Sequence, residues 1–204
     1  MTARKYEQRL RAQAAEETQR RILDAVYARL REAPAEPVSL DQVARIAGVA
    51  RSTVYLIFGS RAGLFDAFGA DLLQRGGFDR LLEAAADPDA REGVRGGVRG
   101  GVFMYAAHRD AWRVLFSMAM LQADAVGGAI QRMEHGRAGG MALLAQRLAD
   151  QRVLRPELSA AEAADLLWLL TSFDSFDLLY TGRSLPADRV ADRLVATAEK
   201  SLIR

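Results

Sequence analysis

The chain has 204 residues, of which 50% are hydrophobic and 26% are charged. This composition is ordinary for a folded protein, and the length suffices for one substantial core or for a small head with a larger body. Cysteine is absent, which excludes disulfides and thiolate metal sites, and the two histidines, His108 and His135, are far apart in sequence. We therefore expect neither a metal site nor a cofactor.

The net charge of +2 is distributed unevenly along the chain. Residues 1–75 contain twelve Lys and Arg against nine Asp and Glu, whereas the remainder contains sixteen against seventeen. A mildly basic N-terminal third favours a nucleic-acid-binding head, although a random scatter of charges explains so small a difference about equally well. The start of the chain has no apolar signal segment, and no run of about 18 apolar residues occurs, so we expect a cytoplasmic protein without a membrane partner.

The chain contains only five prolines and few alternating apolar and polar runs, which predicts an all-α fold. Residues 1–15 are polar and lack a steady apolar stripe, so we interpret them as a flexible basic arm. Such an arm is most simply a frayed terminus, but it could also reach a DNA phosphate or minor groove. Its basic side chains are Arg4, Lys5, Arg9 and Arg11.

The first helix is predicted from Glu16 to about Glu32, where apolar residues recur at helical spacing. Pro34 and Pro37 follow and should end it. The stripe comprises Ile22, Leu23, Val26, Tyr27 and Leu30.

Two short helices joined by a glycine turn follow over 39–58. The first has one apolar face, and Ser39 with Gln42 three residues later predicts a capping box at its start. Gly48 permits the turn. The second helix directs Val54 and Phe58 inward, and this arrangement predicts a helix-turn-helix whose second helix enters the major groove of DNA. The apolar face of the first helix comprises Leu40, Val43, Ala44 and Ala47.

The run Gly48-Val49-x-x-x-Thr53-Val54-Tyr55-x-x-Phe58-x-Ser60-Arg61-x-x-Leu64-Phe65 resembles the DNA-binding domain of the TetR family of bacterial regulators. The match covers roughly residues 16–75, including a connecting helix over 61–75, and we expect Ser60 to cap that helix. The resemblance implies that residues 76–204 form a helical body that binds an effector and dimerises.

The outer face of the second helix supplies the expected DNA contacts. Arg51 can bond a guanine edge, and Ser52 and Thr53 can reach bases or phosphates. The resemblance implies phosphate contacts for Tyr55 and for Arg61, where the family usually has lysine. Two departures concern neighbouring positions: Ala50 replaces a capping residue, and apolar Leu56 and Ile57 could contact thymine methyl groups. The complete expected set is Ser39, Arg51, Ser52, Thr53, Tyr55, Leu56 and Arg61.

Gly76-Gly77 should break the connecting helix, and a short helix over 78–86 follows. Asp87-Pro88 predicts the start of the next helix. That helix contains five glycines within Gly93–Gly101, each costing up to about 1 kcal/mol relative to alanine. The stretch could be an RGG-like RNA-binding tract, could let helices pack closely through Gly93, Gly97 and Gly101, or could be a marginal segment that shifts on binding, which we favour.

Large apolar side chains concentrate in the helices predicted over 110–125 and 130–152 and in their neighbours. They could line a pocket for an apolar or aromatic effector, or could equally be core. Asp174 and Asp177 could face that pocket, or could face solvent or pair with an arginine such as Arg183. The expected pocket set is Phe103, Met104, Trp112, Phe116, Met120, Met141, Trp168, Phe173 and Asp174.

The last two helices are predicted from a capping box at Ser159–Glu162 to about Thr181, and from Pro186 onward. They resemble the family's C-terminal pair, which forms a four-helix bundle across a two-fold dimer; a monomer is the alternative. The expected interface residues are Leu167, Leu170, Leu178, Val190, Leu194 and Leu202.

These features together predict a homodimeric TetR-like transcriptional regulator on near-palindromic double-stranded DNA. The resemblance implies that it is a repressor released by a small apolar or aromatic effector. The alternatives are an activator, or control by a protein partner without a small ligand. A helical carrier or enzyme is remote, because the sequence offers no cysteine nucleophile, no nearby His–carboxylate pair and no phosphate loop.

Overall fold

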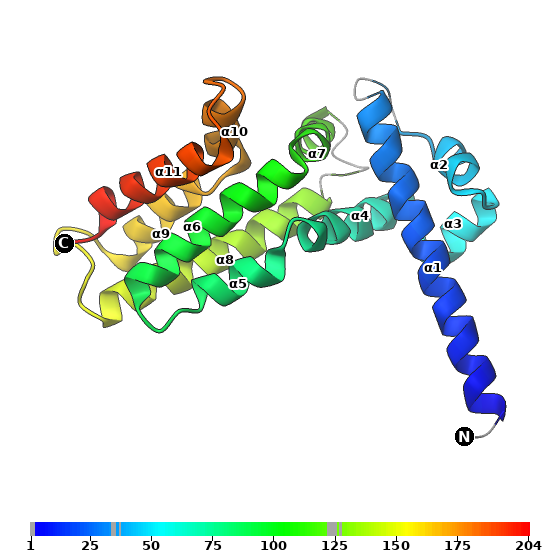
Figure 1. The fold of residues 1–204 in the computed structure, drawn as a ribbon, viewed down its shortest axis with the longest axis horizontal. Helices are drawn as coiled ribbons and strands as arrows, with labels where there is room; N and C mark the ends of the chain where they lie inside the picture. Colours follow the sequence, from blue (N-terminus) through cyan, green and yellow to red (C-terminus); the bar gives the residue numbers. More distant parts are fainter. Residues whose placement is uncertain (1–2, 34–35, 37, 122–125, 127) are drawn as a thin grey trace. The chain divides into compact units, whose positions relative to one another are not determined.

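The computed structural model describes residues 3–33, 36, 38–121, 126 and 128–204, with side chains from residue 7 onward. Within these ranges the regular elements are helices, as Figure 1 shows, so the predicted all-α fold is confirmed. The helices are α1 (Ala3–Glu32), α2 (Leu40–Ala47), α3 (Arg51–Phe58), α4 (Arg61–Arg75), α5 (Phe78–Ala85), α6 (Ala90–Ala107), α7 (Arg109–Leu121), α8 (Gly128–Asp150), α9 (Ala160–Leu170), α10 (Phe173–Tyr180) and α11 (Ala187–Leu202).

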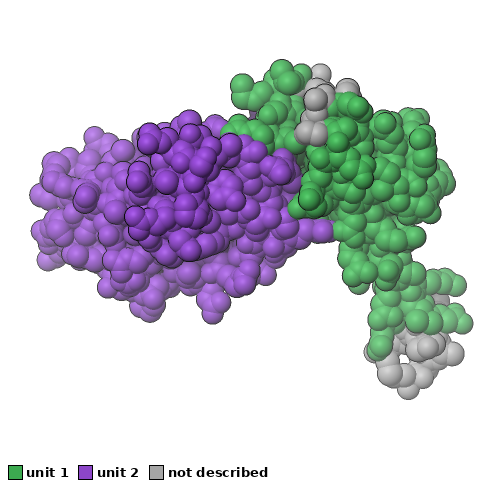
Figure 2. Space-filling view, turned by 45° about the horizontal axis from the view of Figure 1, so that its top comes forward, with its two compact units in different colours: residues 1–71, 113–130 green, residues 72–112, 131–204 purple. Residues whose placement is uncertain are grey.

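The chain divides into two compact units, shown in green and purple in Figure 2. Unit 1 comprises residues 1–71 and 113–130, and unit 2 comprises residues 72–112 and 131–204. Among the described residues, none of the helices combines the length and the apolar character that crossing a bilayer requires.

Helix α1 begins at Ala3, so the prediction that it starts at Glu16 after a flexible arm is wrong. Its side chains are exposed from residue 7 to 21 apart from half-buried Thr18, and burial begins only at Ile22. The N-terminal half is rich in good helix formers, which extend a helix without packing. An apolar stripe therefore reveals only the half that packs. Pro34 and Pro37, expected to end the helix, lie outside the described residues.

Buried Arg29 links the end of α1 to α2. Its Nε donates to Gln42 Oε1 (3.4 Å), its Nη2 to Glu36 Oε2 (2.6 Å) and its Nη1 to the carbonyl of Ala33 (3.0 Å). Gln42 thus contacts Arg29, and the predicted capping box at the start of α2 is wrong. Ser39 is still the N-cap, and it accepts from the Asp41 amide (3.2 Å).

The glycine-rich stretch is a regular part of α6 and allows α5 to pack closely against it. A Cβ added at Gly93 would lie 2.8 Å from the Ala85 carbonyl oxygen, and one at Gly96 would lie 2.7 Å from the Ala84 oxygen. A Cβ added at Gly100 would lie 3.1 Å from the Leu81 Cα atom. The close-packing interpretation is supported, but with Gly96 and Gly100 in place of the predicted Gly97 and Gly101.

We expect Gly96→Ala to lower the free energy of unfolding by about 1–3 kcal/mol, because its methyl group would force the α5 backbone away. Gly101→Ala is the matched control on the same helix, since a Cβ there would meet nothing within 4 Å. The control should be stabilised by up to about 1 kcal/mol. Urea unfolding of the two variants measures both effects, and equal stabilisation of both would contradict the close contact.

The start of α6 and the C-terminal region differ from prediction in two further details. The N-cap of α6 is Asp89, which accepts from the Arg91 amide (2.8 Å), rather than Asp87. The single helix predicted over 159–181 is two helices, α9 and α10. Ser172 breaks it by capping α10, where its hydroxyl oxygen accepts from the Ser175 amide (3.1 Å). The Ser159–Glu162 capping box and the start of α11 after Pro186 are confirmed.

Candidate nucleic-acid interface

Helices α2 and α3 form the predicted helix-turn-helix against α1 in unit 1. Gly48 ends α2 with a left-handed backbone (φ 65°), a conformation that glycine adopts without strain. Ala50 is the N-cap of α3 and makes no side-chain capping hydrogen bond, because alanine has no acceptor in its side chain. Val54 is buried (1% exposed) and fixes the inward side of α3.

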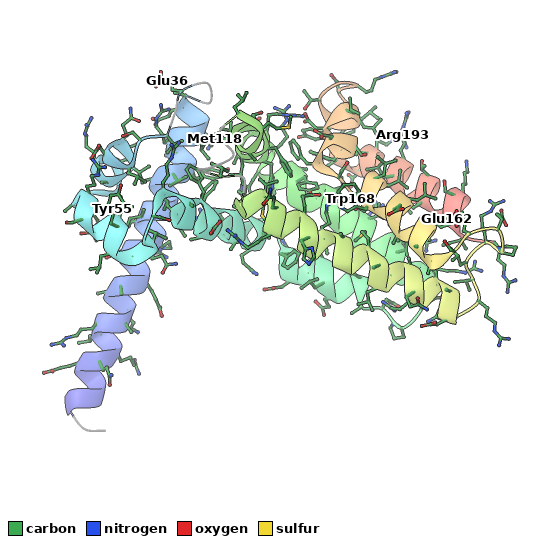
Figure 3. The ribbon with its side chains drawn as sticks, turned by 180° about the vertical axis from the view of Figure 1, so that it is seen from behind. Glu36, Tyr55, Met118, Glu162, Trp168 and Arg193 are labelled. Atoms are coloured by element: carbon green, nitrogen blue, oxygen red, sulfur yellow. The ribbon has the colours of Figure 1, made fainter. Side chains whose placement is uncertain are left out.

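The opposite side of α3 is exposed and carries four of the expected DNA-contacting residues. Tyr55, labelled in Figure 3, is 41% exposed and Leu56 is 86% exposed. Arg51 and Ser52 are also exposed, whereas Thr53 is half-buried. The structure therefore brings the polar groups and one apolar side chain of α3 onto a single accessible face.

Arg51 is held by two neighbours. Its Nη1 donates to Asp41 Oδ2 (3.1 Å), its Nη2 donates to the Tyr55 hydroxyl (3.3 Å), and its guanidinium lies 5.5 Å from the centre of the Tyr55 ring. The hydrogen bond to Tyr55 and the charge of Asp41 raise the pKa of Arg51, which stays protonated. Sequence reasoning missed Asp41, because the pair crosses the turn between two helices.

The two remaining expected DNA residues lie at helix starts. Ser39 is half-buried and caps α2. Ser60 caps α4 as predicted, since its hydroxyl oxygen accepts from the Gly63 amide (3.0 Å). The guanidinium of half-buried Arg61 lies 5.8 Å from the centre of the Phe65 ring, so its stem runs along its own helix.

The residues predicted to line an effector pocket differ widely in their exposure. Met104, Trp112 and Phe173 are buried, and the latter two pack edge-to-face on Tyr105, with ring centres 5.5 and 5.4 Å from its own. Burial raises the pKa of Tyr105. Of the other members, Met141 and Phe116 are half-buried, whereas Met120 (86% exposed), Trp168, Phe103 and Asp174 lie at the surface.

A hollow of about 410 Å³ that sequence reasoning missed lies against α10 and α11, lined by Leu179, Arg193, Leu194, Ala196, Thr197 and Lys200. Among the residues that the structure describes, no three His, Asp or Glu side chains gather in a way that could hold a metal ion.

Asp177 is buried and pairs with Arg109, not with Arg183. Arg109 Nε donates to Asp177 Oδ1 (2.6 Å) and Arg109 Nη2 donates to Asp177 Oδ2 (2.9 Å), so the ion pair is bidentate. The Thr181 hydroxyl donates to the same Oδ1 (2.6 Å). The hydrogen bonds that Arg109 donates to Asp177 raise the pKa of Arg109 above its ordinary value. Asp174, by contrast, is exposed.

Another arginine that sequence reasoning missed, Arg137 of α8, lies against α9. Its guanidinium is 5.0 Å from the Trp168 ring centre, it donates to Thr171 Oγ1 (3.0 Å), and it pairs with Glu134. Trp168, labelled in Figure 3, is thereby fixed at the surface with 44% of its area exposed.

Four of the six residues predicted to form a dimer interface are buried within the chain itself: Leu167, Val190, Leu194 and Leu202. These residues lie on the inner faces of α9 and α11. Little of their surface is therefore left to contact a second copy of the chain. Leu170 is half-buried and Leu178 is 70% exposed. Leu169, which was not among the predicted interface residues, is 58% exposed.

Comparison with known proteins agrees with this architecture. Residues 22–68 match the family model described as bacterial regulatory proteins, tetR family. The native structure of NalD, the secondary repressor of the MexAB-OprM multidrug efflux pump in Pseudomonas aeruginosa, superposes with a TM-score of 0.73 at 24% identity, covering 94% of this chain and 98% of that chain. The comparison with curated proteins finds no match.

A TetR-like transcriptional regulator from Rhodococcus sp. RHA1 gives a TM-score of 0.61 at 26% identity, covering 89% of this chain and 93% of that chain. The match over 22–68 contains both helices of the helix-turn-helix, α2 and α3. Residues 22–68 therefore form the N-terminal domain of the tetR family of bacterial regulatory proteins, and the chain as a whole has the fold of TetR-like transcriptional regulators.

Proposed function

We propose that the chain is a homodimeric repressor that binds a near-palindromic DNA operator through α3. The observation that carries the proposal is the exposed face of α3, on which Arg51 and Tyr55 are held together beside Leu56. In a two-fold dimer, two such helices would enter successive major grooves about 34–36 Å apart. Phosphate contacts would supply most of the affinity and its salt dependence.

The surface proposed for dimerisation is the outer side of α9 and α10. Leu169 and Leu178 are large apolar residues that are mostly exposed in the single chain. Exposed apolar side chains of this size on adjoining helices favour a protein interface. The two-fold symmetry of such a dimer fits a near-palindromic operator.

Release from DNA is proposed to follow binding of a small apolar or aromatic effector in unit 2, in the cytoplasm. The aromatic packing around Tyr105 offers the chemistry for such a ligand, provided that those side chains move. The likeness to NalD, itself a repressor, favours repression over activation. To change the ratio of the released to the DNA-binding conformation from 1:99 to 99:1, the effector must bind the released conformation more tightly by about 5.5 kcal/mol.

Variants at the two paired residues of α3 test the DNA contact. Operators would be selected from random duplexes and their affinities measured at two salt concentrations. We expect Tyr55→Phe to weaken all sequences alike, because a phosphate contact is lost. Arg51→Ala should also relax discrimination at one base pair, by a factor of about 5–150.

Arg189→Ala, an exposed arginine on α11, is the control and should bind as the wild type does. Wild-type affinity in both α3 variants would exclude α3 as the DNA-contacting helix. Deleting the gene and measuring transcription of its neighbours separates the directions of control: a repressor predicts increased transcription, and an activator predicts a decrease.

A further inference from the structure

We propose that Leu56 reads the 5-methyl group of one thymine in each operator half-site; this rests on the proposed function. Leu56 is an apolar side chain that is 86% exposed on a helix proposed to enter DNA. Thymine carries the one apolar group that an A·T or G·C pair presents in the major groove, its C5 methyl.

The helical geometry places Leu56 in the middle of the outward face. Successive residues are rotated by about 100°, so Leu56 and Ser52, each two positions from buried Val54, point about 160° away from it. Tyr55 is rotated by about 100° and Arg51 by about 60°, which puts both on the flank. The side chains that would reach deepest into the groove are therefore those of Ser52 and Leu56.

The contacts of Arg51 support the same assignment. Its guanidinium is engaged by Asp41 and by the Tyr55 hydroxyl on the flank of the helix, away from Leu56. The Leu56 side chain has no hydrogen-bonding group. If it packed against the nitrogen or oxygen atoms of a base edge, those atoms would lose their water without gaining a partner. A thymine methyl group is the base substituent that gains from this contact.

Replacing thymine by deoxyuridine removes only the methyl group and keeps base pairing intact, so it isolates the proposed contact. The experiment takes operators selected by the wild-type protein, substitutes each thymine in turn, and measures dissociation constants. We expect a loss of about fourfold at one position per half-site, and about fifteenfold when both half-sites are changed. Leu56→Ala should bind the thymine operator more weakly and should be indifferent to deoxyuridine at that position.

Leu82→Ala, which truncates an exposed leucine on α5, is the matched control and should retain the full deoxyuridine penalty. Wild-type protein that binds its operator but tolerates deoxyuridine at every position would overturn the inference and leave the proposed function standing. So would a Leu56→Ala variant that retains the penalty. A wild-type protein that selects no DNA sequence would overturn the proposed function itself, and the inference with it.

Discussion

Replacing Asp177 by alanine is expected to lower the free energy of unfolding by about 3–5 kcal/mol. Asp177 is 5% exposed and accepts hydrogen bonds from Arg109 and Thr181. The variant would leave the Arg109 guanidinium, itself largely covered, without its buried counter-charge. The remaining bond from Arg109 to Asp110 is a weak substitute because that carboxylate is 76% exposed. Urea or thermal unfolding measures the loss.

The loss of stability should arise because Arg109 is left largely buried without a counter-charge, and not because the ion pair itself contributes that much stability. Replacing both residues together, as Arg109→Met with Asp177→Leu, should therefore be far less destabilising than Asp177→Ala alone. Asp110→Ala is the matched control, since it removes an exposed carboxylate from the same arginine and should change stability by no more than about 0.5 kcal/mol. A double variant as unstable as the single one would show that the pair itself stabilises the fold.

Local patterns in the sequence were sufficient to predict most of the helices and the helix-turn-helix. The spacing of Leu40, Val43, Ala44 and Ala47 found the buried face of α2, and all four are buried. Ser39, Ser60 and Ser159 were correctly assigned as caps, because a cap depends on residues three or fewer positions away. The unpacked half of α1 was missed because no buried stripe marks it.

Contacts between distant parts of the chain could not be predicted in the same way. Arg109 and Asp177 are 68 residues apart, and nothing in the local pattern of either identifies the other as its partner. The apolar residues of α9 and α11 were recognised as apolar, but their spacing does not distinguish an internal core from a surface for a second copy. The four that were assigned to a dimer interface are buried within the chain.

Because those four residues are buried, the substitution expected to separate the proposed dimer lies at an exposed leucine of α10. We expect Leu178→Glu to weaken dimerisation by about a hundredfold or more, because a carboxylate would be buried against an apolar surface without a partner. Leu178 is 70% exposed in the single chain, so the stability of the protomer should change by no more than about 0.5 kcal/mol. Sedimentation should then give the 22.3 kDa mass of one chain, where the wild type gives twice that mass.

The same variant should lose affinity for a two-half-site operator in parallel, since each protomer would hold only one half-site. Leu82→Glu adds the same charge at an exposed leucine on α5 and should leave both the mass and the DNA affinity unchanged. Leu167→Ala provides the opposite contrast: its fully buried side chain predicts a loss of about 2–5 kcal/mol in protomer stability. If Leu178→Glu remained a dimer with wild-type operator affinity, the outer side of α9 and α10 would not be the interface, and the two recognition helices would have to be brought together by another surface.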